Sequence, residues 1–172
     1  MDLDEFQVAL QKDNWDHVFF SYPVNEQPYS SKINDVTYWK NLRLTWQYAD
    51  EIWKNEKVWR ELLMANRTTR EEFMEPDEQI TFAGLSDPIE IFRGHLEHNA
   101  DGWSWSTDRD KAMEFPIDEE GFPKQTTRFL SIAKVNKTCV IAYLTHAFEY
   151  EIIIPPEAVY DRSNQQIPPT SR

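Results

Sequence analysis

Two glutamates separated by one residue precede an apolar run near the end of the chain. A strand is predicted over residues 148–154, in which Glu149 and Glu151 share one face and lie ~7 Å apart. Two carboxylates at this spacing can divide the roles of charge stabiliser and general base. In a chain this acidic, a solvent-exposed acidic start to a strand is the alternative interpretation.

An arginine at the end of an earlier predicted strand is the second candidate. Residues 89–93 alternate as a strand does, and Gly94 follows Arg93 directly. A guanidinium binds a phosphate or carboxylate through two parallel hydrogen bonds, and glycine lets a ligand approach the backbone. The alternative is an arginine that takes part in a structural salt bridge.

Between the arginine and the glutamates, two serines alternate with two tryptophans. In a strand over residues 103–106, Ser104 and Ser106 lie on one face, and Trp103 and Trp105 lie on the other. Two hydroxyls would then follow one edge, with an aromatic layer behind them. A half-buried edge strand that leads into a helix cap is the alternative.

In this order the three motifs resemble the signature of the arginine–serine–glutamate mono-ADP-ribosyltransferases. The segments Ile-Phe-Arg-Gly, Gly-Trp-Ser-Trp-Ser-Thr-Asp and Glu-Tyr-Glu-Ile-Ile-Ile are similar to those of small bacterial and phage members, and the likeness covers roughly residues 79–157. It implies an α+β fold, with an N-terminal helical lobe followed by a split antiparallel β-sheet core of the ADP-ribosyltransferase type.

The resemblance implies that the chain cleaves the nicotinamide–ribose bond of NAD and transfers ADP-ribose to a protein acceptor. By motif matching, Glu151 stabilises the positive charge that develops on the ribose, as carboxylates do in glycoside chemistry. Glu149 matches the acidic residue associated with arginine acceptors. The segment before Glu149 is short and lacks glycine, which leaves the choice of acceptor open.

The resemblance also implies a set of cofactor-binding residues: Arg93, Gly94, Ser104, Ser106 and Trp105. Arg93 would hold the dinucleotide, and Ser104 would bind the nicotinamide ribose. Either Trp103 or Trp105 would stack on the nicotinamide.

Two other functions remain open at this point. An NAD glycohydrolase would use the same site, with water in place of the acceptor. A non-enzymatic protein would use an acidic surface to bind a basic partner or to inhibit one by mimicking nucleic acid.

The composition excludes several classes of protein. The chain has 172 residues and a formal charge of −12, which argues against direct binding of nucleic acid. No apolar run reaches the ~20 residues of a membrane helix, and the first residues lack signal-peptide features, so a cytoplasmic protein is expected. The single Cys139 lies in an apolar run and is expected to be buried.

No metal site is expected. His95, His98 and Asp101 lie close together in the sequence, but spacings this short are weak evidence for metal ligands. A solvated pair of loop histidines is the preferred interpretation.

The elements that position these residues form one predicted domain, 1–172, with a helical lobe over 1–78. Helical spacing relates the residues Trp39, Leu42, Trp46, Ala49 and Trp53. Asn34 is the predicted N-cap of this helix, and Trp59, Leu62 and Leu63 continue the apolar face. A short helix with a capping box, Thr68 with Glu71 or Thr69 with Glu72, should end before Pro76.

The rest of the domain is predicted to be a β-rich NAD-binding core over 79–157 and an extended tail over 158–172. Besides the strands above, strands are expected at residues 79–83, 128–135 and 138–144. A helix over 108–114, capped by Thr107, should follow the serine strand, and a polar loop is expected over 117–125.

Overall fold

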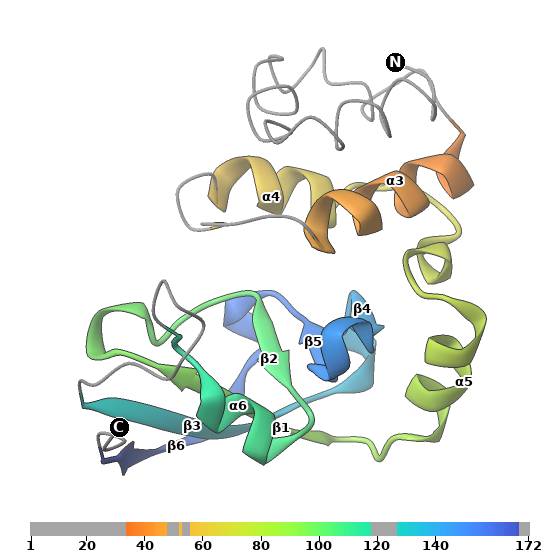
Figure 1. Cartoon of the computed structure of the whole chain (residues 1–172). Coiled ribbons are helices and arrows are strands. Elements are labelled where there is room, and N and C mark those ends of the chain that lie inside the picture. Colours follow the sequence, from red (N-terminus) through yellow and green to blue (C-terminus); the bar gives the residue numbers. More distant parts are fainter. Residues whose placement is uncertain (1–33, 48–51, 53–55, 118–126, 169–172) are drawn as a thin grey trace. The chain divides into compact units, whose positions relative to one another are not determined.

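The computed structural model describes residues 34–47, 52, 56–117 and 127–168. The chain folds as two compact units, Met1–Met74 and Glu75–Arg172 (Figure 1). The boundary lies close to residue 78, where the sequence pattern changes from helices to strands. Most of the predicted loop over 117–125 lies outside the described residues.

The described part of the first unit is helical, as predicted. Helix α3 (Asp35–Gln47) begins at Asn34, whose side-chain oxygen accepts a hydrogen bond from the Thr37 N–H at 3.0 Å. Trp39, Leu42 and Trp46 of the predicted stripe are buried. The other two members of the stripe, at positions 49 and 53, lie outside the described residues.

Helix α4 (Glu56–Leu63) completes the apolar core of this unit. Trp59, Leu62 and Leu63 are all buried, which confirms the predicted apolar face. The ring of Trp46 meets that of Trp59 edge to face, with centroids 5.2 Å apart, so the two helices pack through their tryptophans.

The segment after α4 departs from the predicted capping box. A 3₁₀ helix, Arg70–Phe73, follows Thr69 without a side-chain hydrogen bond at its N-cap. Thr68 instead fastens the start of α3, because its hydroxyl and its N–H donate to the Asp35 carboxylate at 2.6 and 2.9 Å. The predicted helix exists, but its threonines do not cap it.

Helix α5 (Pro76–Gly84) replaces the strand predicted over residues 79–83. Pro76 occupies a first-turn position, where proline favours a helix, so it starts a helix rather than ending one. The Glu78 carboxylate accepts a hydrogen bond from the Glu75 N–H at 2.8 Å and satisfies a donor of the first turn. These start signals outweigh the β-forming residues that follow them.

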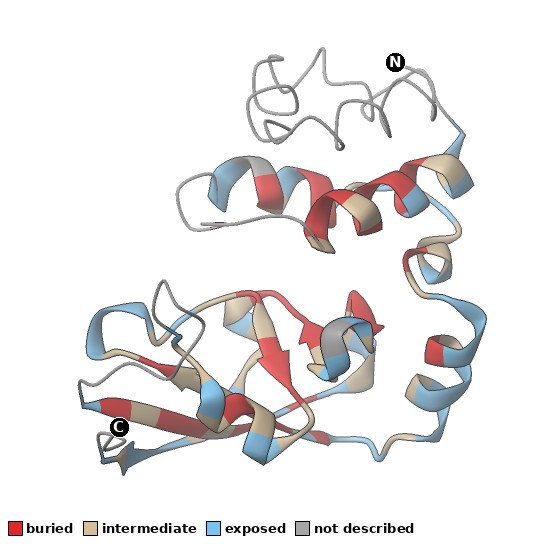
Figure 2. Cartoon of the chain, viewed as in Figure 1, coloured by how far each residue is buried: buried red, intermediate tan, exposed pale blue. Residues whose placement is uncertain are grey.

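The second unit is an α+β structure built on one six-stranded antiparallel sheet with the order β4-β5-β2-β1-β3-β6. The strands are β1 (Ile89–His95), β2 (Ser104–Ser106), β3 (Arg128–Val135), β4 (Ala142–Leu144), β5 (Glu151–Ile153) and β6 (Tyr160–Ile167). Figure 2 shows β2, β4 and β5 mostly buried and β6 mostly exposed. Within the described residues, no helix is long and apolar enough to cross a membrane.

The six strands form one sheet, but the two central strands, β1 and β2, pair over a very short length. The pairing of β1 with β3 runs along the whole of β1, from Ile89 opposite Val135 to His95 opposite Phe129. The pairing of β1 with β2 consists of Phe92 opposite Ser106 alone. The two strands therefore separate on either side of this pair.

Two of the predicted strands begin later than expected. Residues 138–144 contain the end of a 3₁₀ helix, Lys137–Cys139, before β4 begins. Cys139 is partly exposed there rather than buried. Residues 148–154 contain the end of a second 3₁₀ helix, His146–Phe148, and β5 starts only at Glu151.

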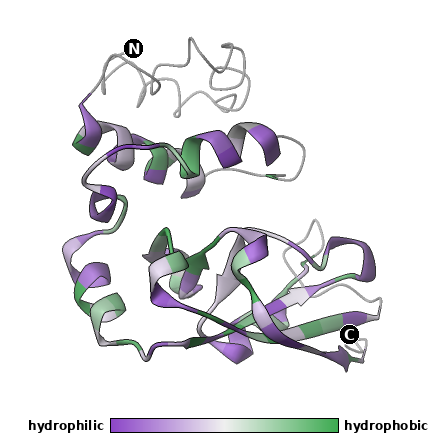
Figure 3. Cartoon of the chain, turned by 180° about the vertical axis from the view of Figure 1, so that it is seen from behind, coloured by the Kyte–Doolittle hydropathy of each residue, from purple (hydrophilic) through white to green (hydrophobic). Residues whose placement is uncertain are grey.

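The prediction of an extended tail over 158–172 is wrong for residues 160–167, which form β6. This edge strand pairs with β3 from Arg128 opposite Ile167 to Lys134 opposite Tyr160. Figure 3 shows β6 to be mainly hydrophilic. Since it lies at the sheet edge with both faces largely exposed, it leaves no apolar alternation in the sequence.

Helix α6 (Arg109–Glu114) packs against β1 at a glycine. Asp108, rather than Thr107, caps the helix, because its carboxylate accepts from the N–H groups of Asp110 and Lys111 at 2.8 and 3.0 Å. A Cβ atom at Gly94 would lie 2.0 Å from the Ala112 oxygen and 2.4 Å from the Phe115 oxygen. Gly94 therefore admits the backbone of the helix segment, which is a structural role that its position after Arg93 did not predict.

This packing predicts that Gly94→Ala destabilises the protein by about 1–3 kcal/mol or more, because backbone atoms must move to admit the methyl group. Gly84→Ala is the matched control. No atom lies within 4 Å of a Cβ at Gly84, so this variant should be neutral or gain up to about 1 kcal/mol. Urea unfolding measures both, and equal stability of the two variants would contradict the close packing.

Candidate functional site

A pocket of about 180 Å³ lies where β1 and β2 separate. Every residue proposed from the sequence for the site lines it: Arg93, Gly94, Ser104, Trp105, Ser106, Glu149 and Glu151. Phe92, Ala112 and Phe115 add an apolar wall. The pocket thus joins an arginine, two serines and two carboxylates from segments far apart in the sequence.

The two glutamates reach the pocket by a different route from the predicted one. Glu151 is the first residue of β5, but Glu149 lies before the strand, with helical backbone angles of φ −84° and ψ −16°. Tyr150, between them, has a positive φ of 49°. A turn therefore brings both carboxylates to one pocket, and the prediction that they alternate along a strand is wrong.

Ser106 and Thr107 hold this turn in place. The Ser106 hydroxyl donates to the Glu149 carbonyl at 2.7 Å and accepts from the Asp108 N–H at 3.0 Å. The Thr107 N–H donates to the Tyr150 carbonyl at 2.9 Å. Because its hydroxyl is engaged in both directions, Ser106 braces the glutamate turn within the protein.

Ser104 has a different environment from Ser106. Its hydroxyl has no hydrogen-bond partner among the described residues, and its side chain is half-buried at the pocket. Strand alternation puts it on the same face as Ser106, which lies opposite Glu151 in the pairing of β2 with β5. Ser104 is therefore the serine whose hydroxyl is open to a ligand.

Arg93 spans the gap between the separating strands. Its Nη1 donates to the Ser104 carbonyl on β2, and its Nη2 donates to the Asn99 carbonyl at 3.4 Å. Its Nε is buried without a hydrogen-bond partner among the described residues. A Cβ at Gly102 would lie 2.6 Å from the guanidinium, so the glycine backbone packs directly against it.

Burial and nearby charges both act on the pKa of Arg93. Burial lowers the pKa of Arg93 to about 10, and the nearby charge of Arg162 acts in the same direction. The carboxylates of Glu151 and Asp101 favour the charged form and oppose this shift. Arg93 therefore remains a cation at neutral pH, within electrostatic reach of Glu151.

Of the two tryptophans, Trp105 lines the pocket, and its indole N–H donates to the Gly102 carbonyl at 3.1 Å. Both tryptophans are buried. The guanidinium carbon of Arg162 lies 5.4 Å from the centre of the Trp105 ring, within the range of a cation–π interaction.

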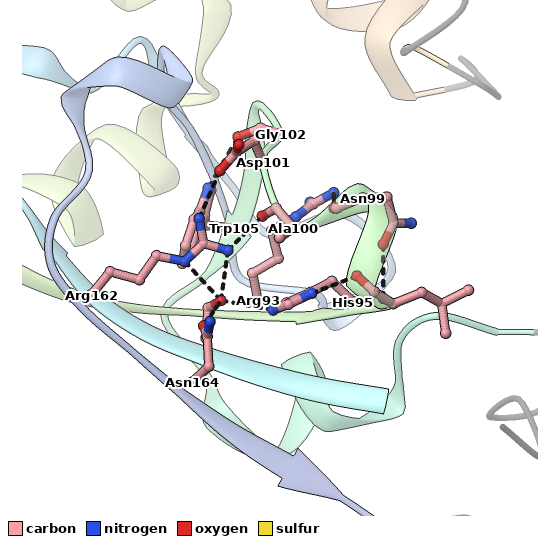
Figure 4. Close-up of polar contacts among 11 residues, drawn as sticks. Arg93, His95, Asn99, Ala100, Asp101, Gly102, Trp105, Arg162 and Asn164 are labelled. Atoms are coloured by element: carbon pink, nitrogen blue, oxygen red, sulfur yellow. Dashed lines mark hydrogen bonds and ion pairs between the residues drawn. The ribbon is translucent and has the colours of Figure 1, made fainter. Parts of the chain in front are cut away.

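A polar cluster beside the pocket was not anticipated from the sequence (Figure 4). The Ser131 hydroxyl lies 2.8 Å from His95 Nε2 and donates to Asn164 Oδ1 at 2.7 Å. Arg162 donates to the same hydroxyl from β6. Nothing in the sequence marked Arg162 as a member of this cluster, because the strand that carries it, β6, was not predicted.

His95 corrects the picture of a solvated histidine pair. It is 2% exposed and stacks on Phe129, with centroids 5.8 Å apart, whereas His98 is exposed. Burial lowers the pKa of His95 and favours the neutral ring. No group of three or more metal-ligating side chains occurs in the described parts of the chain.

Glu149 has the electrostatics of a candidate base. Burial raises its pKa, while His146 and Lys111 lower it and Glu114 raises it. A carboxylate with a raised pKa holds a proton more readily than a solvated one, which suits general-base work near neutral pH.

The raised pKa of Glu149 predicts a pH effect on stability. The folded state binds this proton more tightly than the unfolded state, so the contribution of Glu149 is most favourable in acid. It falls as pH rises from the usual value of 4.5 through the raised one. Glu149→Gln removes this titration and should gain stability relative to the unmodified protein between about pH 4 and about pH 7.

Urea unfolding across this range measures the difference. Glu90→Gln, at an exposed position of β1, is the control for the general effect of replacing a glutamate by glutamine. A difference that stays constant with pH in Glu149→Gln would contradict the raised pKa.

Comparison of the chain with protein-family models, curated proteins and solved structures finds no match.

Proposed function

We propose that the chain is an NAD-dependent mono-ADP-ribosyltransferase that modifies an arginine of a protein acceptor. The observation that carries this proposal is the convergence of three motif residues, Arg93, Ser104 and Glu151, on one pocket. They come from β1, β2 and β5, and the motif resemblance requires them in a common site.

The proposed chemistry centres on Glu151. When nicotinamide leaves, positive charge develops on the ribose, and a fixed carboxylate beside it stabilises the transition state. Glu151 lies at the start of β5, opposite Ser106, so its backbone is held by the sheet. Ser104 supplies an open hydroxyl for the ribose on the same face.

Glu149 is suited to the acceptor. An arginine guanidinium is almost always charged in water, so its attack on the ribose requires a carboxylate that orients it and takes up a proton. The preceding Phe148 has a 72% exposed side chain and a positive φ of 57°. The glutamate turn therefore presents an apolar surface to an incoming protein beside the proposed base.

The dimensions of the pocket indicate how NAD would bind. A volume of about 180 Å³ is below the ~300–1,000 Å³ of pockets that enclose a complete small ligand. The pocket would therefore hold the nicotinamide end, and the rest of the dinucleotide would lie outside it. The cation of Arg93 would attract the negatively charged part.

The sheet supports an assignment to the ADP-ribosyltransferase fold. Two groups of three strands, β4-β5-β2 and β1-β3-β6, meet at the single pair of Phe92 and Ser106. This narrow junction supports the proposal of a split core, in which the NAD site would lie at the division.

A binding protein without activity is the second candidate, and two contacts favour it. Arg93 bonds to backbone carbonyls and the Ser106 hydroxyl is engaged within the protein. A purely structural role therefore explains the presence of Arg93 and of Ser106 without any bound NAD. The charge of −12 would then serve to capture a basic partner, and such binding should weaken steeply as salt concentration rises.

Incubation with labelled NAD and a cell lysate tests the proposal. Label on protein indicates transfer, free ADP-ribose indicates an NAD glycohydrolase, and intact NAD contradicts both activities.

Glu151→Gln should lower nicotinamide release by about 10²–10³-fold, because it preserves size and removes the stabilising charge. Glu157→Gln, at an exposed position of the 3₁₀ helix Pro156–Ala158, is the control and should retain full turnover. Thermal melting checks that both variants fold. Normal turnover in a folded Glu151→Gln protein would show that the catalytic glutamate is misassigned.

Glu149→Ala should separate the two half-reactions. It should lose labelling of arginine acceptors but keep slow nicotinamide release, since water needs less assistance than a guanidinium. Glu151→Ala should lose both signals, because both reactions pass through the same cationic ribose. The two signals are measured on the same samples, and parallel loss of both in Glu149→Ala would refute this division of roles.

A further inference from the structure

We propose that Arg162 is a positioning residue for the NAD site. It holds residues 99–102 of the β1–β2 connection in the conformation that keeps Arg93 against the pocket. This role rests on the proposed function. Arg162 lies on β6, two strands from β1 in the sheet, and it does not line the pocket itself.

The guanidinium of Arg162 bridges the sheet and the connection (Figure 4). On the sheet side, Nε and Nη2 donate to the Ser131 hydroxyl at 3.0 and 2.8 Å. On the other side, Nη2 donates to the Ala100 carbonyl at 2.8 Å and Nη1 donates to Asp101 Oδ1 at 2.7 Å. One rigid, planar group thus ties β3 to two consecutive residues of the connection.

The same connection also contacts Arg93 of β1. Arg93 donates to the Asn99 carbonyl, and its guanidinium packs against the Gly102 backbone so closely that a methyl group there would displace it. Trp105 donates to the Gly102 carbonyl and lies beneath Arg162. A shift of residues 99–102 would therefore move the surface on which Arg93 rests.

The contacts of Arg162 differ in how strongly they fix its position. The Asp101 side chain is 83% exposed, so its ion pair with Arg162 contributes little. The Ser131 hydroxyl is fully buried, and the Arg162 side chain is only 24% exposed. The hydrogen bonds to Ser131 and to the Ala100 carbonyl therefore determine the geometry, and they need the fork of an arginine.

The electrostatics indicate a geometric role for Arg162. Its positive charge disfavours the charged form of Arg93 and contributes to the lowered pKa of Arg93. Placing a second cation here does not stabilise the first. The role proposed for Arg162 therefore rests on its hydrogen bonds to the connection and not on its charge.

The test compares Arg162→Met and Arg162→Lys with the control Lys134→Met. Lys134 is a half-exposed cation of β3 that pairs with Asp161, away from the connection. Its variant removes the same charge as Arg162→Met. The KM for NAD and kcat are measured by nicotinamide release, and backbone amide exchange is measured without NAD.

Both Arg162 variants should raise KM for NAD about tenfold or more while kcat falls less than about threefold. Lysine should not rescue the effect, because one ammonium cannot make the same set of bonds. The Asn99 amide, which donates to the Leu96 carbonyl, should exchange faster in both variants. Lys134→Met should match the unmodified protein in all three readouts.

The possible failures can be told apart. Absence of NAD turnover in the unmodified protein would overturn the proposed function, and this role with it. Normal turnover with unchanged KM in both Arg162 variants would overturn the positioning role alone. Unchanged exchange at Asn99, a fall in kcat without a change in KM, or loss of folding in both variants would overturn it as well.

Discussion

The site depends on the hydrogen bond from the Arg93 guanidinium to the Ser104 carbonyl, which crosses the place where β1 and β2 separate. A sheet whose central strands share one pair of residues would lose backbone hydrogen bonds on either side of that pair. The Arg93 guanidinium supplies a hydrogen-bond donor to the Ser104 carbonyl of β2 at the place where β1 and β2 have separated. The pocket exists because the strands separate, and the arginine allows them to do so.

This arrangement explains why several site residues have structural partners. Gly94 is small because α6 packs against it, and Gly102 is small because Arg93 packs against it. Ser106 holds the glutamate turn through a carbonyl rather than pointing a free hydroxyl at the pocket. Under the proposed function, these residues shape the site, while Ser104 and Glu151 would contact the ribose.

The strongest local patterns predicted the fold best. The tryptophan spacing and Asn34 located α3, where burial on one face leaves a periodic pattern. Alternation located β1, and a segment rich in β-forming residues located β3. Residues 79–83 were misassigned, because the β-forming side chains of Ile80, Thr81 and Phe82 are ambiguous until the helix-start signals at Pro76 and Glu78 are weighed. Strand β6 left no pattern, because an exposed edge strand needs none.

The candidate residues were predictable from motif order, but their geometry was not. Glu149 and Glu151 were assigned correctly to one neighbourhood for the wrong reason, since a turn with a positive φ at Tyr150 places them there. Arg162 and Ser131 were missed, because their roles arise from strand pairing between distant segments. Long-range register of this kind has no local signature in a single sequence.

The proposed function requires that NAD binds in the pocket between β1 and β2. An NMR titration of the backbone amides with NAD tests this binding. The amide resonances of Gly94, Ser104 and Glu151 should shift, with little change at Lys134 and Tyr160 on the far strands. Shifts centred outside the pocket, or none at about 1 mM NAD, the upper end of usual KM values, would contradict it.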